Sequence, residues 1–264
     1  MNSLVYQAVK TSESKSTHVE DALVLEAPLQ ISINGEPYTV VMRTPGDDAE
    51  LIRGLLYAED IYKEDTPLEL HKVKEEENGT SEINVRIAKE RMGSGYMNQR
   101  TLLSVSSCGV CGKQKLEAVQ LAGNALKNSN TYSLDDLKKM SMSMSQAQTL
   151  FKLTGGSHAT AAFDAQGSLL SLKEDIGRHN ALDKVIGALI KKGELEKASC
   201  ILVSGRVSYE IVAKAFTAKI PIIVAVSACS SLAVDYAKEF GICLIGFSRS
   251  DKLTIYANPQ YIAL

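Results

Sequence analysis

The second half of this 264-residue chain alternates short, nearly continuous apolar runs with segments of helical periodicity, and this alternation limits its fold most. Strands have such unbroken apolar runs when helices cover both faces of a sheet. The runs are Cys200–Val203, Ile222–Val226 and Ile242–Ile245. Because the connections between them are short and contain helices, we expect parallel strands. The C-terminal half is therefore predicted to be an α/β sandwich.

Parallel strands place their carboxyl ends at one edge of a sheet, where open α/β sheets bind their ligands. The segments after the three runs offer small residues, hydroxyl groups and two arginines: Ser204-Gly205-Arg206, Ser227–Ser231 and Phe247-Ser248-Arg249-Ser250. Helix N-termini, serines and arginines together are typical of phosphate sites. Any one loop carries little information, since serine and glycine are common in short loops. Because all three loops are expected at the same edge of the sheet, together they predict a nucleotide-binding edge.

The first half has the pattern of a smaller α+β region that is rich in β-hairpins. Alternating apolar residues around Asn34-Gly35 predict one hairpin, and a second is expected around Asn78-Gly79. The Ser/Met stretch 141–145 is expected to link the two halves. We expect a polar N-terminal tail over residues 1–27, an α+β region with a mobile cysteine loop over residues 28–140, and a C-terminal α/β domain that binds a nucleotide or cofactor over residues 141–264.

Composition argues against several classes of protein. A content of 45% hydrophobic and 23% charged residues, with no long apolar segment, is typical of a water-soluble globular protein. A net charge of −2 provides no basic field for nucleic acid or an anionic membrane. Five cysteines, three of them in or beside apolar runs, suit a reducing compartment. Since residues 1–20 contain no apolar leader, we expect a cytoplasmic protein.

Cys108 and Cys111 form a C-x-x-C among serines and glycines, directly before a predicted helix. The helix N-terminus and Lys113 both favour thiolate over thiol. A sulfur carrier and a thioredoxin-like dithiol fit this local sequence about equally. A zinc site fits less well because the chain has no second C-x-x-C, although His158 and His179 could add ligands. A pair of inert, buried thiols is a poor fit to so polar a setting.

His158 and His179 both lie near the boundaries of predicted elements, and their local sequences differ. An isolated histidine is more often structural than functional. His179 is the better candidate because Asp175, Arg178 and Asn180 surround it in sequence at a predicted helix start. We therefore expect Asp175, Arg178 and His179 to shape the pocket at the sheet edge.

Five motifs stand in order along the chain: Met42–Asp48, Ser107–Gly112, Thr154–Ala159, Glu174–Lys184 and Ser204–Glu210. Together they closely resemble the formate dehydrogenase accessory sulfurtransferases, the FdhD family, from about Pro28 to the C-terminus. The resemblance implies a sulfur carrier that takes sulfur from a cysteine desulfurase as a persulfide. It also implies that this sulfur passes to the molybdenum cofactor, as bis-(molybdopterin guanine dinucleotide), before the cofactor enters formate dehydrogenase.

By motif position, the resemblance makes Cys108 the persulfide cysteine and Cys111 its auxiliary neighbour. It places the cofactor-binding segment at Phe247, Ser248, Arg249, Ser250, Asp251 and Lys252. The topology adds Ser204, Gly205, Arg206 and His179 as candidate cofactor-binding residues. The resemblance further implies a homodimer, a cytidine deaminase-like fold in the larger domain, and a cofactor bound as substrate with no permanent metal. Deaminase activity itself is disfavoured because the H-x-E and P-C-x-x-C signature is absent.

Two departures from the family pattern concern the predicted pocket. Relatives usually carry Ala-Pro-Thr-Ser where this chain has Ala228-Cys229-Ser230-Ser231, and glycine where it has Ser250. Two rival functions remain open. A non-catalytic chaperone of the molybdenum cofactor would need the pocket but not Cys108, whereas a dithiol oxidoreductase would need both Cys108 and Cys111.

Overall fold

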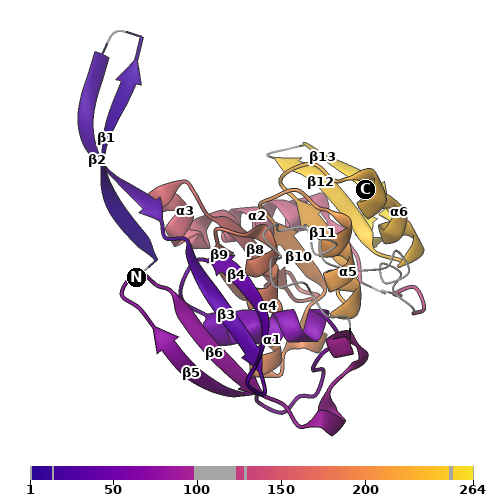
Figure 1. Ribbon diagram of the computed structural model, residues 1–264. Coiled ribbons are helices and arrows are strands. Elements are labelled where there is room, and N and C mark those ends of the chain that lie inside the picture. Colours follow the sequence, from indigo (N-terminus) through magenta and orange to yellow (C-terminus); the bar gives the residue numbers. More distant parts are fainter. Residues whose placement is uncertain (1, 14, 98–122, 128–129, 250–251, 264) are drawn as a thin grey trace.

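The computed structural model describes residues 2–13, 15–97, 123–127, 130–249 and 252–263. Its largest element is a six-stranded sheet in the order β13-β12-β11-β10-β8-β9 (Figure 1). The strands are β8 (His158–Phe163), β9 (Leu169–Asp175), β10 (Cys200–Val203), β11 (Ile222–Ala225), β12 (Cys243–Arg249) and β13 (Lys252–Ala257). The parallel pairing of β10, β11 and β12 confirms the prediction from the apolar runs. The remaining pairs, β8 with β10, β8 with β9 and β12 with β13, are antiparallel.

Helices cover both faces of this sheet, so the C-terminal half is a layered α/β structure. The helices α4 (Arg178–Lys192), α5 (Tyr209–Thr217) and α6 (Ser231–Glu239) share one buried core with one face. On the opposite face, α2 (Leu134–Ala147) packs against the alternate residues of the same strands. In β10, for example, Ile201 faces the first core and Leu202 the second.

The Ser/Met stretch 141–145 is not a linker, and that expectation was wrong. It lies inside α2, where Leu137, Met140 and Met144 recur at helical spacing and are buried against the sheet. Ser133 caps this helix through a reciprocal pair of hydrogen bonds with Asp136. The expected domain boundary between residues 140 and 141 therefore falls within a helix whose buried side chains belong to the core of the C-terminal half.

The N-terminal region contains a second sheet, in the order β4-β3-β6-β5, with α1 (Asp48–Ala58) packed on it. Its strands are β3 (Ala27–Ile33), β4 (Glu36–Arg43), β5 (Glu69–Glu75) and β6 (Ser81–Arg86). Both predicted hairpins are confirmed. Asn34 and Gly35 have positive φ angles of 53° and 88°, as a two-residue type I′ turn requires.

Short elements complete the described chain. They are α3 (Thr149–Thr154), β7 (Tyr132–Ser133), β14 (Ile262–Ala263) and 3-10 turns at Lys89–Arg91, Ser94–Met97, Leu195–Lys197 and Pro259–Tyr261. The helix expected around residues 116–126 lies largely outside the described residues, and residues 123–127 are neither helix nor strand. In the part of the chain that the structure describes, no helix has the length and apolarity to cross a lipid bilayer.

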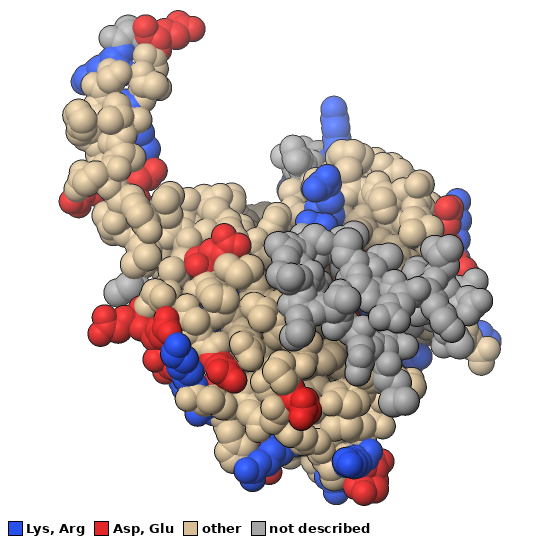
Figure 2. All heavy atoms as spheres, in the orientation of Figure 1, with Lys and Arg blue, Asp and Glu red and all other residues tan. Residues whose placement is uncertain are grey.

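The expected polar tail is instead an arm, which we define as β1 (Ser3–Ser12) and β2 (Lys15–Val24). The two strands pair antiparallel from Ser3↔Val24 to Ser12↔Lys15. Figure 1 and Figure 2 show the arm projecting from the rest of the molecule. The tail prediction was wrong because a polar composition does not exclude β structure. A ribbon with water on both faces needs few apolar residues. Val and Thr, which favour strands, occur in both segments, and Tyr6 occurs in β1.

Helices α1 and α4 join the two halves through an unusually close contact. A Cβ atom added at Gly54 would lie 1.9 Å from the carbonyl oxygen of Asp183. A Cβ added at Gly187 would lie 1.9 Å from the carbonyl oxygen of Glu50. Each glycine therefore allows the backbone of one helix to touch the other, and this contact fixes the N-terminal sheet against the α/β half.

We predict that Gly54→Ala lowers the free energy of unfolding by roughly 3 kcal/mol, because the new methyl group meets backbone that cannot move aside cheaply. Urea denaturation followed by circular dichroism measures the change. The control is Lys191→Ala, which removes an exposed ion pair with Glu50 and should cost less than about 1 kcal/mol. Equal effects of the two substitutions would contradict the close-contact interpretation.

Candidate functional site

The predicted site residues fall into two groups. Cys108, Cys111, Ser250 and Asp251 lie outside the described residues. The others lie at or beyond the edge where β10, β11 and β12 end, as the topology predicts. The starts of β8, α4 and α5 lie at the same edge because β8 runs antiparallel to β10 and because α4 and α5 follow β9 and β10.

Ser204 organises the end of β10. Its Oγ accepts a hydrogen bond of 2.9 Å from the backbone N–H of Ala159 and lies 3.2 Å from Nδ1 of His158. A Cβ atom at the buried Gly205 would lie 3.2 Å from Cδ of Arg178 and 3.3 Å from Cε1 of His158. The lack of a side chain at Gly205 thus allows the histidine and the arginine to approach the same loop.

The surroundings of His158 are electropositive. Burial lowers the pKa of His158, and the charges of Arg178, His179 and Arg206 lower it further, while Asp175 partly opposes them. The imidazole is therefore neutral at neutral pH. The cations that make it unfavourable for His158 to take up a proton would also attract a bound anion. The N-termini of α4 and α5, which carry partial positive charge, add to this attraction. These features favour an anionic ligand at this edge.

His179 connects the starts of α4 and α5. Its Nε2 lies 3.0 Å from Oε2 of Glu210 and 3.3 Å from Oγ of Ser208, the residue that precedes α5. The His179 side chain is buried, and its Nδ1 has no hydrogen-bond partner in the described part of the chain. His179 therefore holds the two helix starts together beneath the loop of Ser204.

Asp175 does not face the pocket, contrary to our expectation. It is fully buried, and its carboxylate accepts hydrogen bonds from the N–H groups of Thr44 and Gly177 and from the side chain of Asn180. Nζ of Lys184 lies 2.7 Å from it and also donates to the carbonyl oxygen of Thr44. This cluster ties the loop after β4 to the start of α4. The sequence motif around Asp175 is therefore largely structural.

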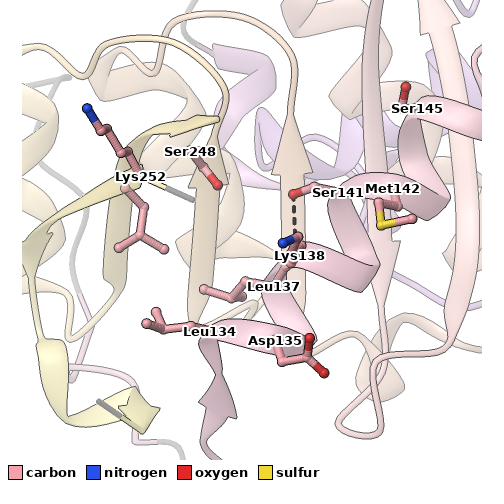
Figure 3. Close-up of a pocket in the computed structure, with 10 residues that line it drawn as sticks. Leu134, Asp135, Leu137, Lys138, Ser141, Met142, Ser145, Ser248 and Lys252 are labelled. Atoms are coloured by element: carbon pink, nitrogen blue, oxygen red, sulfur yellow. Dashed lines mark hydrogen bonds between the residues drawn. The ribbon is translucent and has the colours of Figure 1, made fainter. Parts of the chain in front are cut away.

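The other half of the edge lies where β12 meets β13. Phe247 is exposed, has a φ of 52°, and donates its backbone N–H to the carbonyl oxygen of Ser227. The backbone of Arg249 pairs with Lys252. Ser248 and Lys252 line a cavity of about 480 Å³ whose opposite wall is α2 (Figure 3).

Helix α2 gives this cavity an apolar wall with polar groups at its rim. Leu134, Leu137 and Met142 contribute the apolar part, and Lys138 and Ser141 the polar part. Small-molecule pockets commonly combine these features at this size. The sequence did not identify these residues because α2 reaches the β12–β13 edge only in the folded structure. The available signal was the Met-rich composition of residues 141–145, since methionines are common on apolar binding surfaces.

The described cysteines are poor nucleophiles. Burial raises the pKa of Cys229 to about 11 and that of Cys243 to about 12, and it raises the pKa of Cys200 as well. All three are therefore protonated thiols at neutral pH. Sγ of Cys229 would lie 3.0 Å from a Cβ at Gly246, so this thiol packs against β12. Among the residues described, no group of three or more His, Cys, Asp or Glu side chains could hold a metal ion.

We predict that Lys184→Met lowers the free energy of unfolding by about 3–5 kcal/mol, because it leaves the Asp175 carboxylate buried without its cation. Thermal and urea unfolding measure the loss. Lys139→Met, which removes an exposed ion pair with Asp135, is the matched control and should cost less than about 1 kcal/mol. The double variant Asp175→Asn/Lys184→Met should recover part of the loss, and a failure to recover any would contradict the ion-pair account.

Known proteins share both the sequence and the fold of this chain. Residues 24–263 match the model of the FdhD/NarQ family. A "Sulfur carrier protein FdhD" from Mycobacterium tuberculosis is 42% identical over 253 residues, 92% of each chain. Another from Sulfolobus acidocaldarius is 39% identical over 256 residues, covering 97% of this chain and 96% of its own. The crystal structure of a protein from Desulfotalea psychrophila, described as a formate dehydrogenase accessory protein, has the same fold. It superposes with a TM-score of 0.77 over the full length of both chains, and the two sequences are 21% identical. The chain belongs to the FdhD/NarQ family.

Proposed function

We propose that this protein is a sulfur carrier that serves the maturation of formate dehydrogenase. Its relatives bear the name of sulfur carrier protein, and the family match spans both the C-x-x-C motif and the sheet edge. The observation that carries the proposal is the grouping of Ser204, the neutral His158 and the cationic Arg178 around Gly205, at the end of β10. Such an edge suits an anionic, nucleotide-containing substrate rather than a peptide.

In the first step, the Cys108 thiolate attacks the outer sulfur of a persulfide on a cysteine desulfurase. The sulfur–sulfur bond of the donor breaks, a new one forms on Cys108, and the donor cysteine leaves as a thiolate. No net oxidation takes place. Delivery of the outer sulfur as sulfide takes two electrons, which a second thiolate supplies as it forms a disulfide with Cys108. Cys111 or a small cellular thiol could act as this reductant.

The acceptor in this proposal is the molybdenum cofactor in its bis-(molybdopterin guanine dinucleotide) form, bound as substrate. Ser204, Arg206 and Arg178 would bind its phosphates, with Gly205 giving them close access to the backbone. Ser248 and Lys252, with the backbone of Phe247 and Arg249, would hold a second part of the molecule beside the cavity under α2. His179 would act by positioning the starts of α4 and α5. The protein would work as a homodimer in the cytoplasm.

The strand arrangement supports the finer fold assignment. A central β10 flanked by the parallel β11 and by the antiparallel β8, with α4 and α5 starting at the ligand edge, fits the cytidine deaminase-like sandwich that the family resemblance implies. The polar groups of His179, Ser208 and Glu210 occupy the helix starts in this protein. We therefore propose that the edge binds a nucleotide without deaminase chemistry.

Activation of formate dehydrogenase in cells that lack their own copy of this protein tests the sulfur step. We predict that Cys108→Ala lowers formate dehydrogenase activity at least 100-fold, because the persulfide has no carrier. Cys243→Ala, which removes a buried, protonated thiol on β12, is the control and should retain activity. Full activity of Cys108→Ala with failure of Arg178→Ala would favour the cofactor chaperone. Equal loss in Cys108→Ala and Cys111→Ala, with a disulfide that cycles, would favour the dithiol oxidoreductase.

Guanosine diphosphate tests the phosphate site. We predict that Arg178→Ala weakens its binding about 10-fold, which corresponds to one lost charge-assisted hydrogen bond, whereas Lys139→Ala on the outer face of α2 leaves it unchanged. The bound anion favours the imidazolium form, so the pKa of His158 should rise when the nucleotide binds. Isothermal calorimetry and an NMR titration of the histidine rings measure the two effects. Unchanged affinity in Arg178→Ala, or a His158 pKa that stays constant, would contradict the assignment.

A further inference from the structure

The core between the six-stranded sheet and helices α4 and α5 is polar at the end nearest the sheet edge. Thr160 on β8 lies directly opposite Val203, the last residue of β10, and opposite residues of an antiparallel pair share a face. Because Val203 belongs to this core, Thr160 also faces α4 and α5. Thr160 is fully buried, and His179, three residues before the core residue Leu182, is 5% exposed. The two side chains therefore close the same core at the same end.

Polar atoms at this end of the core are buried and have no hydrogen-bond partner among the residues that the structure describes. They are Oγ1 of Thr160, Nδ1 of His179 and Nε of Arg178. Cδ of Arg178, the carbon bonded to Nε, lies 3.2 Å from the position of a Cβ at Gly205, so this nitrogen lies beneath the same loop. Burial without a partner is costly for a polar atom, and native proteins pair nearly all such atoms with protein or with ordered water. The three atoms together therefore indicate a bound molecule that completes their hydrogen bonds.

This molecule must both donate and accept hydrogen bonds. Nε of Arg178 only donates, and the Thr160 hydroxyl can do either. Nε2 of His179 lies 3.0 Å from Oε2 of Glu210, and a carboxylate at this distance favours the proton on Nε2, which leaves Nδ1 as an acceptor. An anion could not donate to Nδ1, and a cation could not accept from Nε. Water has two protons and two lone pairs, and buried water typically makes about three hydrogen bonds.

We propose that one internal water molecule lies beneath the loop of Ser204 and Gly205. It accepts a hydrogen bond from Nε of Arg178, donates one to Nδ1 of His179 and bonds to Oγ1 of Thr160. The water thereby joins β8 to the first turn of α4 and holds the guanidinium group of Arg178 at Nε.

The water site goes beyond the proposed function, although it bears on one of its residues. Arg178 is assigned there to a substrate phosphate, so the water belongs to the frame that orients this arginine at the sheet edge. The site itself follows from buried atoms of the folded chain, whether or not a nucleotide binds. The two ideas can therefore be rejected separately.

The nearly isosteric substitution Thr160→Val tests the site through the sign of its effect on stability. If a water bonds to the hydroxyl, the substitution removes a hydrogen bond and leaves the water short of one partner, so we expect the urea midpoint of unfolding to fall. If the hydroxyl were buried without any partner, its removal would raise the midpoint. The control is Thr254→Val at an exposed position on β13, which measures the separate effect of replacing threonine by valine in a strand.

A crystal structure of the full, nucleotide-free chain at a resolution that shows ordered water tests the site directly. We expect one water peak within hydrogen-bond distance of Oγ1 of Thr160, Nδ1 of His179 and Nε of Arg178. The proposal is overturned if no single water contacts all three atoms, if these side chains bond directly to one another, or if Thr160→Val does not lower the midpoint relative to Thr254→Val. Neither measurement involves sulfur transfer or nucleotide binding, so such a result would leave the proposed function standing.

Discussion

The buried pair of Asp175 and Lys184 positions most of what surrounds the candidate site. It holds the loop at Thr44 and the first turn of α4 against one another, and this ties the N-terminal region to the α/β half. Buried ion pairs seldom add much net stability, because desolvation offsets their attraction. In this protein the pair has a positioning role. It fixes the turn that leads into α4, and Arg178 and His179 are the first residues of that helix. The close contact of α1 with α4 at Gly54 and Gly187 holds the same two parts of the molecule together.

The sheet edge where β10, β11 and β12 end is suited to holding an anion. Among the residues described, it contains no activated thiol. His158 is kept neutral by burial and by the nearby cations, and the N-termini of two helices point to the same region. Burial keeps the three described cysteines protonated. The proposed function therefore assigns binding and sulfur chemistry to different parts of the chain: the sheet edge would recognise the substrate, and the C-x-x-C segment would carry the sulfur.

Local patterns predicted the elements whose signals are local. Continuous apolar runs predicted the parallel strands, and Asn34-Gly35 and Asn78-Gly79 predicted the two hairpins. Predictions failed where tertiary contacts decide the outcome. The serines of α2 suggested a linker, although Leu and Met recur there at helical spacing and are buried. The charge of Asp175 suggested a contact with a ligand, although partners from distant segments bury this side chain. The cavity beneath α2 depends on two segments about a hundred residues apart, so no sequence window contains it.

The measurement that tests the account most directly is peptide mass spectrometry after incubation of the protein with a cysteine desulfurase and cysteine. The account predicts that the Cys108 peptide gains one sulfur atom, that a reductant removes it, and that guanosine diphosphate does not prevent its loading, because the sheet edge and the cysteine segment act separately. A Cys108 peptide that stays unmodified, or that shows only a disulfide with Cys111, would contradict the assignment of sulfur carriage to Cys108.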